Sequence, residues 1–178
     1  MAKVNEIRTE RLVLRRLRPE DAGDLRRMIS DWDVIRMLAR PPYPYTSEHA
    51  EDFIAKAFRY PWEFAITGPA FMGVVGITGH LGYWLGRPFW GKGYMTEAAS
   101  ALIDTYFAKD RSDIVSGVFT DNPGSRGVLS KLGFTETGVS KQMCVPRGEE
   151  VDHIDMILNR STWLERTAKL DADARERD

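Results

Sequence analysis

Residues 81 to 98 read LGYWLGRPFWGKGYMTEA, and this stretch decides the fold. Its first five residues are mostly apolar or aromatic, as is typical of a short strand, and Pro88, Gly91 and Gly93 then indicate a turn. After the turn, apolar side chains recur at positions 95, 98, 99, 102, 103 and 106, which is helical spacing. The sequence therefore predicts a strand that leads through a glycine turn directly into a helix.

The glycine turn is a candidate anion-binding site. The first N–H groups of a helix have no partner within it, and the helix dipole places partial positive charge there. Gly91 and Gly93 remove the Cβ atoms that would obstruct a phosphate, and Lys92 adds a cation. The turn therefore predicts a phosphate-bearing ligand. The alternative is a tight turn that only packs the helix against the strand.

Two common phosphate loops fit the turn poorly. Gly86 and the Gly91-Lys92 pair have the spacing of a P-loop, but Gly93 stands where that loop needs a hydroxyl group for magnesium. A P-loop nucleotidase is thus a weaker alternative. The dinucleotide fingerprint is excluded because Ala98-Ala99-Ser100 stands where a third glycine is needed.

The stretches GYWL at 82–85 and WGKGYMTEA at 90–98 resemble the acyl-CoA-binding segment of the GNAT acetyltransferase superfamily. They are similar in particular to the RimJ/RimL-type N-acetyltransferases, which acetylate protein N-termini. Residues 122–134 resemble the second signature of the superfamily, and the resemblance extends from about Thr9 to Trp163. One departure is Pro88, which stands where the family often has Gln or Arg, with Arg87 one residue earlier.

The resemblance implies an α/β (α+β) fold. Its mixed, mostly antiparallel sheet of six to seven strands would contain a central splayed parallel strand pair and have helices on both faces. Hydrophobic periodicity, caps and breakers along the chain predict the individual elements. The expected strands are 7–17, 62–67, 71–78, 81–85, 113–120, 134–145 and 150–158. The expected helices are 19–29, 33–38, one capped by Thr46 or Ser47, the one after the glycine turn, and one that Gly133 ends.

Two further segments have expected roles. Arg11, Arg15 and Arg16 would form the solvated face of the first strand. The proline-rich loop 40–45 is expected to be either a wall of the acceptor site, through Tyr43 and Tyr45, or part of a satellite hydrophobic cluster.

The resemblance also implies site residues. The backbone N–H of Leu85 would meet the oxyanion of the tetrahedral intermediate. The superfamily's usual catalytic tyrosine is replaced by Leu129, so Ser125 is expected to donate a proton to the CoA sulfur; its alternative role is to cap the helix together with Asn122. The expected contacts with acetyl-CoA, the co-substrate, are Leu85, Arg87, Trp90, Gly91, Lys92, Gly93, Tyr94, Met95, Asn122, Ser125 and Lys131.

The general base is left open among Glu63, His80, Asp152 and His153. His80 stands at a turn and is included among the candidate catalytic residues, since an imidazole at the mouth of a cleft can accept a proton near neutral pH. Alternation along a strand sends Asp152 and His153 to opposite faces, so at most one of them would point into the cleft.

Composition narrows the function further. The 178 residues fit a single acyl-CoA N-acyltransferase domain, 1–178, with a charged tail at about 164–178. A net charge of -1 argues against nucleic acid as a partner, and the one cysteine, Cys144, excludes a cysteine-cluster metal site; no metal is expected. No apolar run or signal-peptide pattern predicts membrane association, so a cytoplasmic monomer or homodimer is expected.

The sequence thus predicts an N-acetyltransferase that uses acetyl-CoA and acts on a primary amine, possibly a protein N-terminal α-amine. Two alternatives remain open. One is a non-catalytic acyl-CoA-binding or regulatory module, and the other is a GNAT enzyme for a small-molecule amine such as an antibiotic or polyamine.

Overall fold

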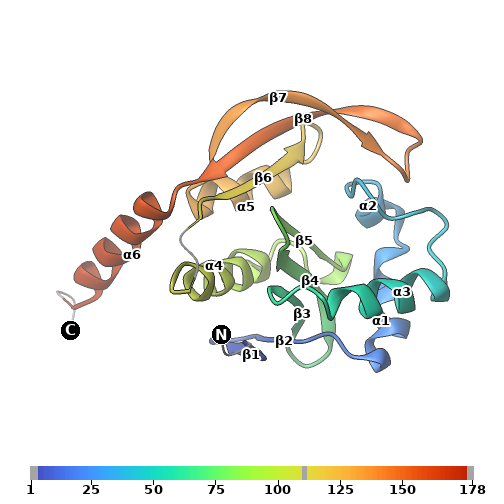
Figure 1. The fold of residues 1–178 in the computed structure, drawn as a ribbon, viewed down its shortest axis with the longest axis horizontal. Helices are drawn as coiled ribbons and strands as arrows, with labels where there is room; N and C mark the ends of the chain where they lie inside the picture. Colours follow the sequence, from blue (N-terminus) through green and yellow to red (C-terminus); the bar gives the residue numbers. More distant parts are fainter. Residues whose placement is uncertain (1–3, 110–111, 176–178) are drawn as a thin grey trace.

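The structure is a computed structural model that describes residues 4–109 and 112–175 (Figure 1). Within this part of the chain, eight strands form two antiparallel sheets, one of five strands in the order β1-β2-β3-β4-β5 and one of three in the order β6-β8-β7. The strands are β1 (Glu6–Arg8), β2 (Val13–Arg15), β3 (Glu63–Thr67), β4 (Phe71–Ile77), β5 (Leu81–Leu85), β6 (Ile114–Phe119), β7 (Thr135–Cys144) and β8 (Glu149–Leu158).

Helices cover both faces of the five-stranded sheet (Figure 1). Along β3, Phe64 and Ile66 point into the core beneath α4, while Ala65 points into a second core beneath α1 and α3. This alternation is the period of two expected of a strand buried on both faces. The helices are η1 (Pro19–Asp21), α1 (Ala22–Ile29), α2 (Trp32–Ile35), α3 (Ser47–Ala57), η2 (Arg87–Phe89), α4 (Tyr94–Phe107), α5 (Pro123–Leu132) and α6 (Arg160–Arg175).

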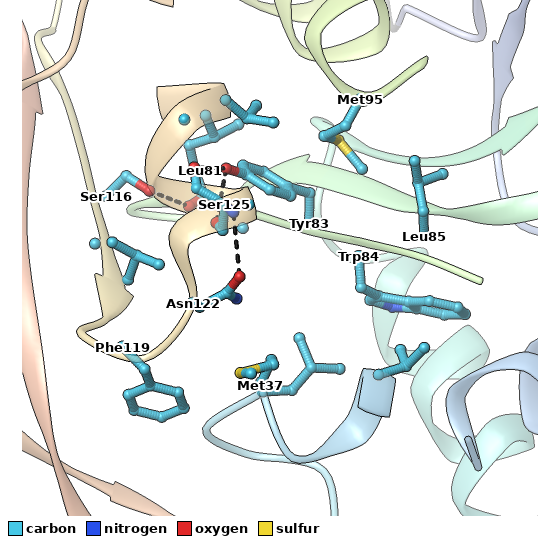
Figure 2. A pocket seen from close by; sticks show the side chains of 18 of the residues that line it. Met37, Leu81, Tyr83, Trp84, Leu85, Met95, Ser116, Phe119, Asn122 and Ser125 are labelled. Carbon is cyan, nitrogen blue, oxygen red and sulfur yellow. Dashed lines mark hydrogen bonds between the residues drawn. The ribbon is translucent and has the colours of Figure 1, made fainter. Parts of the chain in front are cut away.

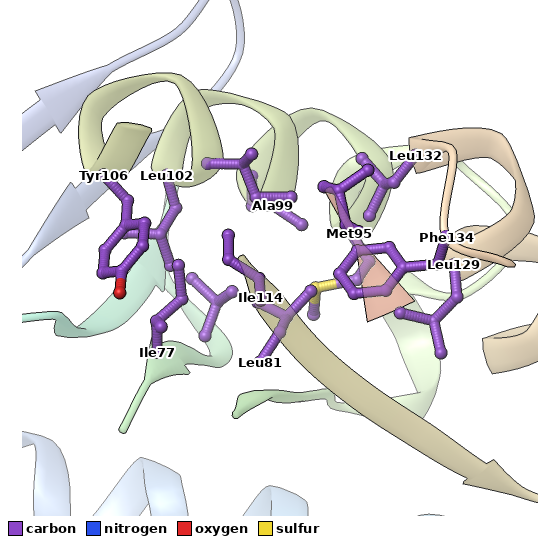
Figure 3. Close-up of a cluster of buried hydrophobic side chains, with 14 of the residues drawn as sticks. Ile77, Leu81, Met95, Ala99, Leu102, Tyr106, Ile114, Leu129, Leu132 and Phe134 are labelled. Carbon is purple, nitrogen blue, oxygen red and sulfur yellow. The ribbon is translucent and has the colours of Figure 1, made fainter. Parts of the chain in front are cut away.

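Helix α4 joins the two sheets through the larger core. Its Met95, Ala99 and Leu102 pack on side chains from both sheets, including Leu81 of β5 and Ile114 of β6 (Figure 3). All five residues are almost fully buried. The helix predicted from the glycine turn is therefore the element that holds the two sheets together.

Strands β5 and β6 splay apart as predicted. No ladder joins them in the described residues, and they meet where Ser116 Oγ donates a 2.9 Å hydrogen bond to the carbonyl oxygen of Leu81. The predicted GNAT-like fold class is confirmed. It differs in detail from the expected six to seven strands, because the strands number eight in the described residues and divide at the splay.

The predicted first strand is interrupted. Residues 7–17 form a short hairpin, β1 and β2, in which Thr9 N donates to Leu12 O over 3.0 Å. The hydroxyl of Thr9 also accepts a bond from Leu12 N, so a side chain stabilises the reversal. The alternation of leucine and arginine gave no sign of this turn.

The arginines of this segment were wrongly expected to be only a solvated face. Arg15 forms a two-point ion pair with the buried Asp21, with distances of 2.7 and 2.8 Å. Arg16 donates to the carbonyls of Ala57, Tyr60 and Glu63. These cations tie the hairpin to η1 and to the end of α3.

The hairpin of β7 and β8 arches over β6 and reaches the segment after α2 (Figure 1). Val145 N donates to Ala39 O over 2.9 Å at the hairpin tip. Arg147 in the turn donates to Arg36 O and forms a two-point ion pair with Asp121, which follows β6. Distant parts of the chain are thus connected around one opening.

Helix α6 is longer than the frayed tail expected at 164–178. It begins at Arg160, and Trp163 anchors it, with a buried ring whose Nε1 donates to Asp104 on α4 over 2.7 Å. Residues 176–178 of the expected tail lie outside the described residues. No helix in the described part of the chain has the length and hydropathy to span a bilayer.

Candidate active site

A cleft of about 1080 Å³ opens where β5 and β6 diverge. Its walls come from the two strands, the glycine turn with the start of α4, the start of α5, and the segment from α2 to Arg40. Figure 2 shows Tyr83 and Ser125 on one side of this space and Met37 with Phe119 on the other. The cleft is long enough to bring a ligand from the glycine turn to the base of the splay.

The glycine turn has the backbone conformation that its sequence requires. Gly91 and Gly93 have φ angles of +71° and +78°, in the left-handed region, and a Cβ added at Gly91 would have nothing within 4 Å. Gly93 is the N-cap of the fourteen-residue α4. The turn therefore leaves open space beside unpaired N–H groups, which fits a phosphate group.

Two side chains hold the turn in place. Trp90 Nε1 donates to Leu85 O over 2.8 Å, which fastens the turn to the end of β5. Arg11 donates to Lys92 O over 3.0 Å and forms an ion pair with Glu97 on α4. A site whose N–H groups are fixed before the ligand arrives loses less free energy in ordering them.

Strand β5 presents backbone N–H groups to the cleft. Gly86 N donates to Met72 O of β4, whereas the carbonyl groups of Leu81 and Leu85 accept side-chain bonds on the opposite side. Because N–H and C=O directions alternate along a strand, the N–H groups of Tyr83 and Leu85 also point to the side of the splay. An N–H group directed toward the splay agrees with the role that the resemblance implied for Leu85.

Ser125 lies at the start of α5, where the side chain of Asn122 accepts a 3.1 Å bond from Ser125 N (Figure 2). The serine hydroxyl lies 2.9 Å from the phenol oxygen of Tyr83. Burial raises the pKa of Tyr83 and the hydrogen bond with Ser125 opposes that rise, so the phenol keeps its proton. A protonated phenol therefore lies next to Ser125, although the family's usual position holds the buried Leu129.

The sequence analysis missed Tyr83 as a site residue, although a signal was available. Leu81, Tyr83 and Leu85 share one face of β5 by alternation, and Leu85 was already expected in the site. The same alternation could have predicted that the side chain of Tyr83 projects to this side.

The structure brings most of the predicted residues to the cleft, but not all. Arg87 is not among the lining residues described, and its guanidinium forms a 2.7 Å ion pair with Asp33. Lys92 also lies off the lining, with Nζ donating to Pro88 O. The predicted residues that do line the cleft are His80, Leu85, Trp90, Gly91, Gly93, Tyr94, Met95, Asn122, Ser125 and Lys131.

A family model described as "Acetyltransferase (GNAT) domain" matches residues 11–135. The chain belongs to the GNAT acetyltransferase family. It is therefore an N-acetyltransferase, and the family uses acetyl-CoA. This assignment removes the P-loop nucleotidase alternative.

Curated relatives agree with the GNAT assignment. A Bacillus licheniformis protein named "Uncharacterized N-acetyltransferase p20" is 30% identical over 161 residues, which span 81% of this chain and 90% of the relative. An Escherichia coli protein named "[Ribosomal protein uS5]-alanine N-acetyltransferase" is 29% identical over 178 residues, 87% of this chain and 91% of the relative. The predicted RimJ/RimL-like resemblance is confirmed.

Solved structures support the fold. A GNAT-family acetyltransferase from Bacillus anthracis superposes with a TM-score of 0.73 at 22% identity, covering 88% of this chain and 99% of that one. RimL, a ribosomal-protein α-N-acetyltransferase solved with coenzyme A, superposes with a TM-score of 0.76 at 22% identity, covering 87% and 98%.

The structure separates the four base candidates of this GNAT chain. Glu63 does not line the cleft; burial raises its pKa, against the opposing charge of Arg16. Asp152 points away and pairs with Lys141 over 2.8 Å. His80 and His153 both line the cleft, so the expectation that only one of Asp152 and His153 would face it holds.

Loop 40–45 was expected to be either a wall of the acceptor site or part of a satellite hydrophobic cluster. Tyr45 is buried in the second core, and the exposed Tyr43 packs against Trp32; neither lines the cleft. The nearby residues that do line the cleft are Arg36 to Arg40 together with Phe119. Of the two interpretations of loop 40–45, the satellite cluster is thus the one that applies to Tyr45.

Proposed function

We propose that this enzyme transfers the acetyl group of acetyl-CoA to a protein N-terminal α-amine. The acceptor rests on two supports: the likeness to the E. coli [ribosomal protein uS5]-alanine N-acetyltransferase, and a cleft open enough for an extended peptide end. The observation that carries the proposal is the Tyr83–Ser125 pair, whose side-chain oxygens lie 2.9 Å apart beside the cleft (Figure 2). A small-molecule amine is the second candidate acceptor.

In this proposal, N–H groups from Gly91 to Met95 bind the diphosphate of acetyl-CoA, since the N–H of Trp90 already donates to Arg87 O over 3.2 Å. Gly91 and Gly93 leave them accessible, and the α4 dipole favours the negative charge. Lys131 lines the same cleft and supplies a cation near the phosphates, while the amide of Asn122 is placed for the pantetheine.

Acetyl-CoA supplies a thioester whose carbonyl carbon accepts the amine. The N–H groups of Leu85 and Tyr83 stabilise the negative charge that develops on the carbonyl oxygen. When the C–S bond breaks, Ser125 donates its proton to the thiolate. Tyr83, protonated and 2.9 Å from the serine oxygen, stabilises the charge left on Ser125.

The experiment is a thiol-release assay with acetyl-CoA against N-terminal peptides, aminoglycosides and polyamines. The proposal expects turnover with α-amine peptides in preference to the other two classes. Thiol release with a small-molecule amine alone would transfer the acceptor assignment to that amine. CoA binding without thiol release from any amine would instead favour the non-catalytic acyl-CoA-binding module.

Ser125→Ala tests the proton donor. We expect kcat to fall by about 10²-fold, because a positioned acid contributes at least that much. The control is Ser130→Ala, a neighbouring and exposed serine on the same helix, which is expected to leave kcat unchanged. A decrease of less than about threefold in Ser125→Ala would refute the role of this hydroxyl.

A further inference from the structure

Two imidazoles lie above two glycines where the splay closes. Gly82 follows Leu81 and Gly117 follows Ser116, the two residues that connect β5 to β6. His80 Nε2 lies 3.5 Å from the Cβ position of Gly82, and His153 Nε2 lies 2.6 Å from that of Gly117. A side chain on Gly117 would collide with His153. The two glycines therefore give the imidazoles room on the face of the strands opposite α4.

Asp155 orients His153. The two residues share one face of β8, and Nδ1 of His153 lies 2.9 Å from Oδ1 of Asp155. Since a carboxylate only accepts, Nδ1 carries the proton and Nε2 keeps a free lone pair. Ser140 of β7 donates to the same carboxylate oxygen over 3.0 Å, which fixes Asp155 in turn. The free nitrogen of His153 is thus the one above Gly117.

The two imidazoles differ in their charged surroundings. Burial, followed by the charges of Arg40 and His153, lowers the pKa of His80, so His80 stays neutral at pH 7. His153 instead has the carboxylate of Asp155 at its Nδ1, and the edge of the Phe119 ring against its face. Arg147 lies over the Phe119 ring, with 5.2 Å between its guanidinium carbon and the ring centroid. His153 therefore has a carboxylate partner, whereas no side-chain hydrogen bond of His80 is found among the described residues.

We propose that His153, positioned by Asp155, removes the proton from the acceptor ammonium, and that neutral His80 accepts a hydrogen bond from the same amine. This inference rests on the proposed function and assigns its missing base. The N–H bond of the ammonium breaks and its proton passes to Nε2 of His153. The neutral nitrogen then forms the C–N bond with the thioester carbonyl carbon, and the C–S bond breaks as the tetrahedral intermediate collapses. Ser125 protonates the leaving thiolate, the nitrogen loses its second proton, which restores Ser125 through solvent, and the imidazolium releases its proton to solvent.

The pKa of the acceptor amine sets how much the base is expected to raise kcat/KM. An α-amine has a pKa of about 8, so roughly a tenth is neutral at pH 7. Removing the base therefore lowers kcat/KM by about tenfold at pH 7. The loss shrinks as the pH rises past 8, because solvent then deprotonates the amine without help.

The test measures kcat/KM from pH 6 to pH 9.5 with an α-amine peptide for the wild type, His153→Gln and His49→Gln. His49 is the remaining one of the three histidines of the chain. It serves as a matched control, because Gln at that position preserves the capping box of α3. We expect His153→Gln to lose about tenfold at pH 7 and to approach the wild type near pH 9.5. His49→Gln should follow the wild type throughout.

Asp155→Asn is a second variant, which tests the same role if His153→Gln does not fold. It is expected to show a smaller loss of kcat/KM at pH 7, with the same recovery at high pH. Affinity for CoA should be unchanged in all variants. A loss that stays constant across the pH range, or one of less than about twofold at pH 7, would overturn the role of His153. Absence of turnover in the wild type would instead show that the proposed function itself has failed.

Discussion

At the scale of single residues, the proposed mechanism assigns to the contact between Tyr83 and Ser125 the role that a catalytic tyrosine would have at the position of Leu129. The tyrosine comes from strand β5 and the serine from helix α5, so two elements provide what one helix usually does in this family. A phenol that stays protonated can stabilise the serine oxygen as its proton leaves.

Tyr83→Phe tests this contact. We expect kcat to fall about tenfold with the KM for acetyl-CoA unchanged, since a hydrogen bond to a charged group contributes about 1.5 kcal/mol. In Ser125→Ala the same substitution should have little further effect, because residues that act together are not additive. Tyr60→Phe, at an exposed position, is the control. Equal losses in both backgrounds would show that the two residues act independently.

Glu97 offers a pH-dependent test of stability. Burial opposes its ionisation, but bonds from Thr9 and Arg11 outweigh burial, and the pKa is lowered. A lowered carboxyl pKa stabilises the fold above the unfolded value of about 4.3, and this stabilisation is lost as the pH falls through the folded pKa. Glu97→Gln should therefore lower the free energy of unfolding by about 2 kcal/mol at pH 7.

Urea unfolding at pH 7 and at about pH 3 measures this difference, which should be smaller at the lower pH. Glu51→Gln, an exposed carboxylate on α3, is the matched control. A difference between the wild type and Glu97→Gln that is equal at both pH values would contradict the assignment.

At the scale of elements, Trp163 is the buried residue that anchors α6 on α4, beside the bonds that Arg160 makes to Asp113 and Phe107. Trp163 is 3% exposed and donates to Asp104, whereas its neighbour Leu164 on the same helix is 42% exposed. Trp163→Ala should lower the free energy of unfolding by about 3–5 kcal/mol, through lost burial and the loss of the hydrogen bond to Asp104. Leu164→Ala is expected to change it by less than about 0.5 kcal/mol. Similar values for the two variants in urea unfolding would contradict the anchoring role of Trp163.

At the scale of the whole molecule, Arg147 connects the β7–β8 hairpin, the segment after α2 and the end of β6. Its hydrogen bonds lower the pKa of Asp121, ahead of the opposing effect of burial, so this carboxylate is ionised at neutral pH. Removing Arg147 breaks its bonds to Arg36 and Asp121, while the backbone bond from Val145 to Ala39 remains. The glycine turn, by contrast, has no contact with this network among the hydrogen bonds described.

Arg147→Ala is accordingly expected to raise the KM for the acceptor about fivefold, which is about 1 kcal/mol. The Kd for CoA should be unchanged, as measured by titration. Arg8→Ala removes an exposed arginine paired with Glu6 and serves as the control. An equal loss of affinity for CoA would show that the substitution disturbs the whole cleft.

Local patterns explain how much of this molecule could be predicted. The glycine turn, α4 and the cap at Asn122 depend on neighbours in sequence, and all were found. The break between β1 and β2, the ion pair of Arg15 and the contact between Tyr83 and Ser125 depend on the tertiary structure. Periodicity gives the face of a strand that a side chain occupies, but not the element that it meets there.

The bond from Ser116 to Leu81 has a mechanical consequence. Each sheet satisfies its own backbone ladders, so a wider gap between β5 and β6 would sacrifice no interstrand backbone bond in the described residues. The gap between the two strands is held by the hydroxyl of Ser116 and by the side chains packed beneath α4. We therefore expect the packing of the core beneath α4 to set the size of the acyl group that fits between β5 and β6. Single core substitutions can adjust that packing.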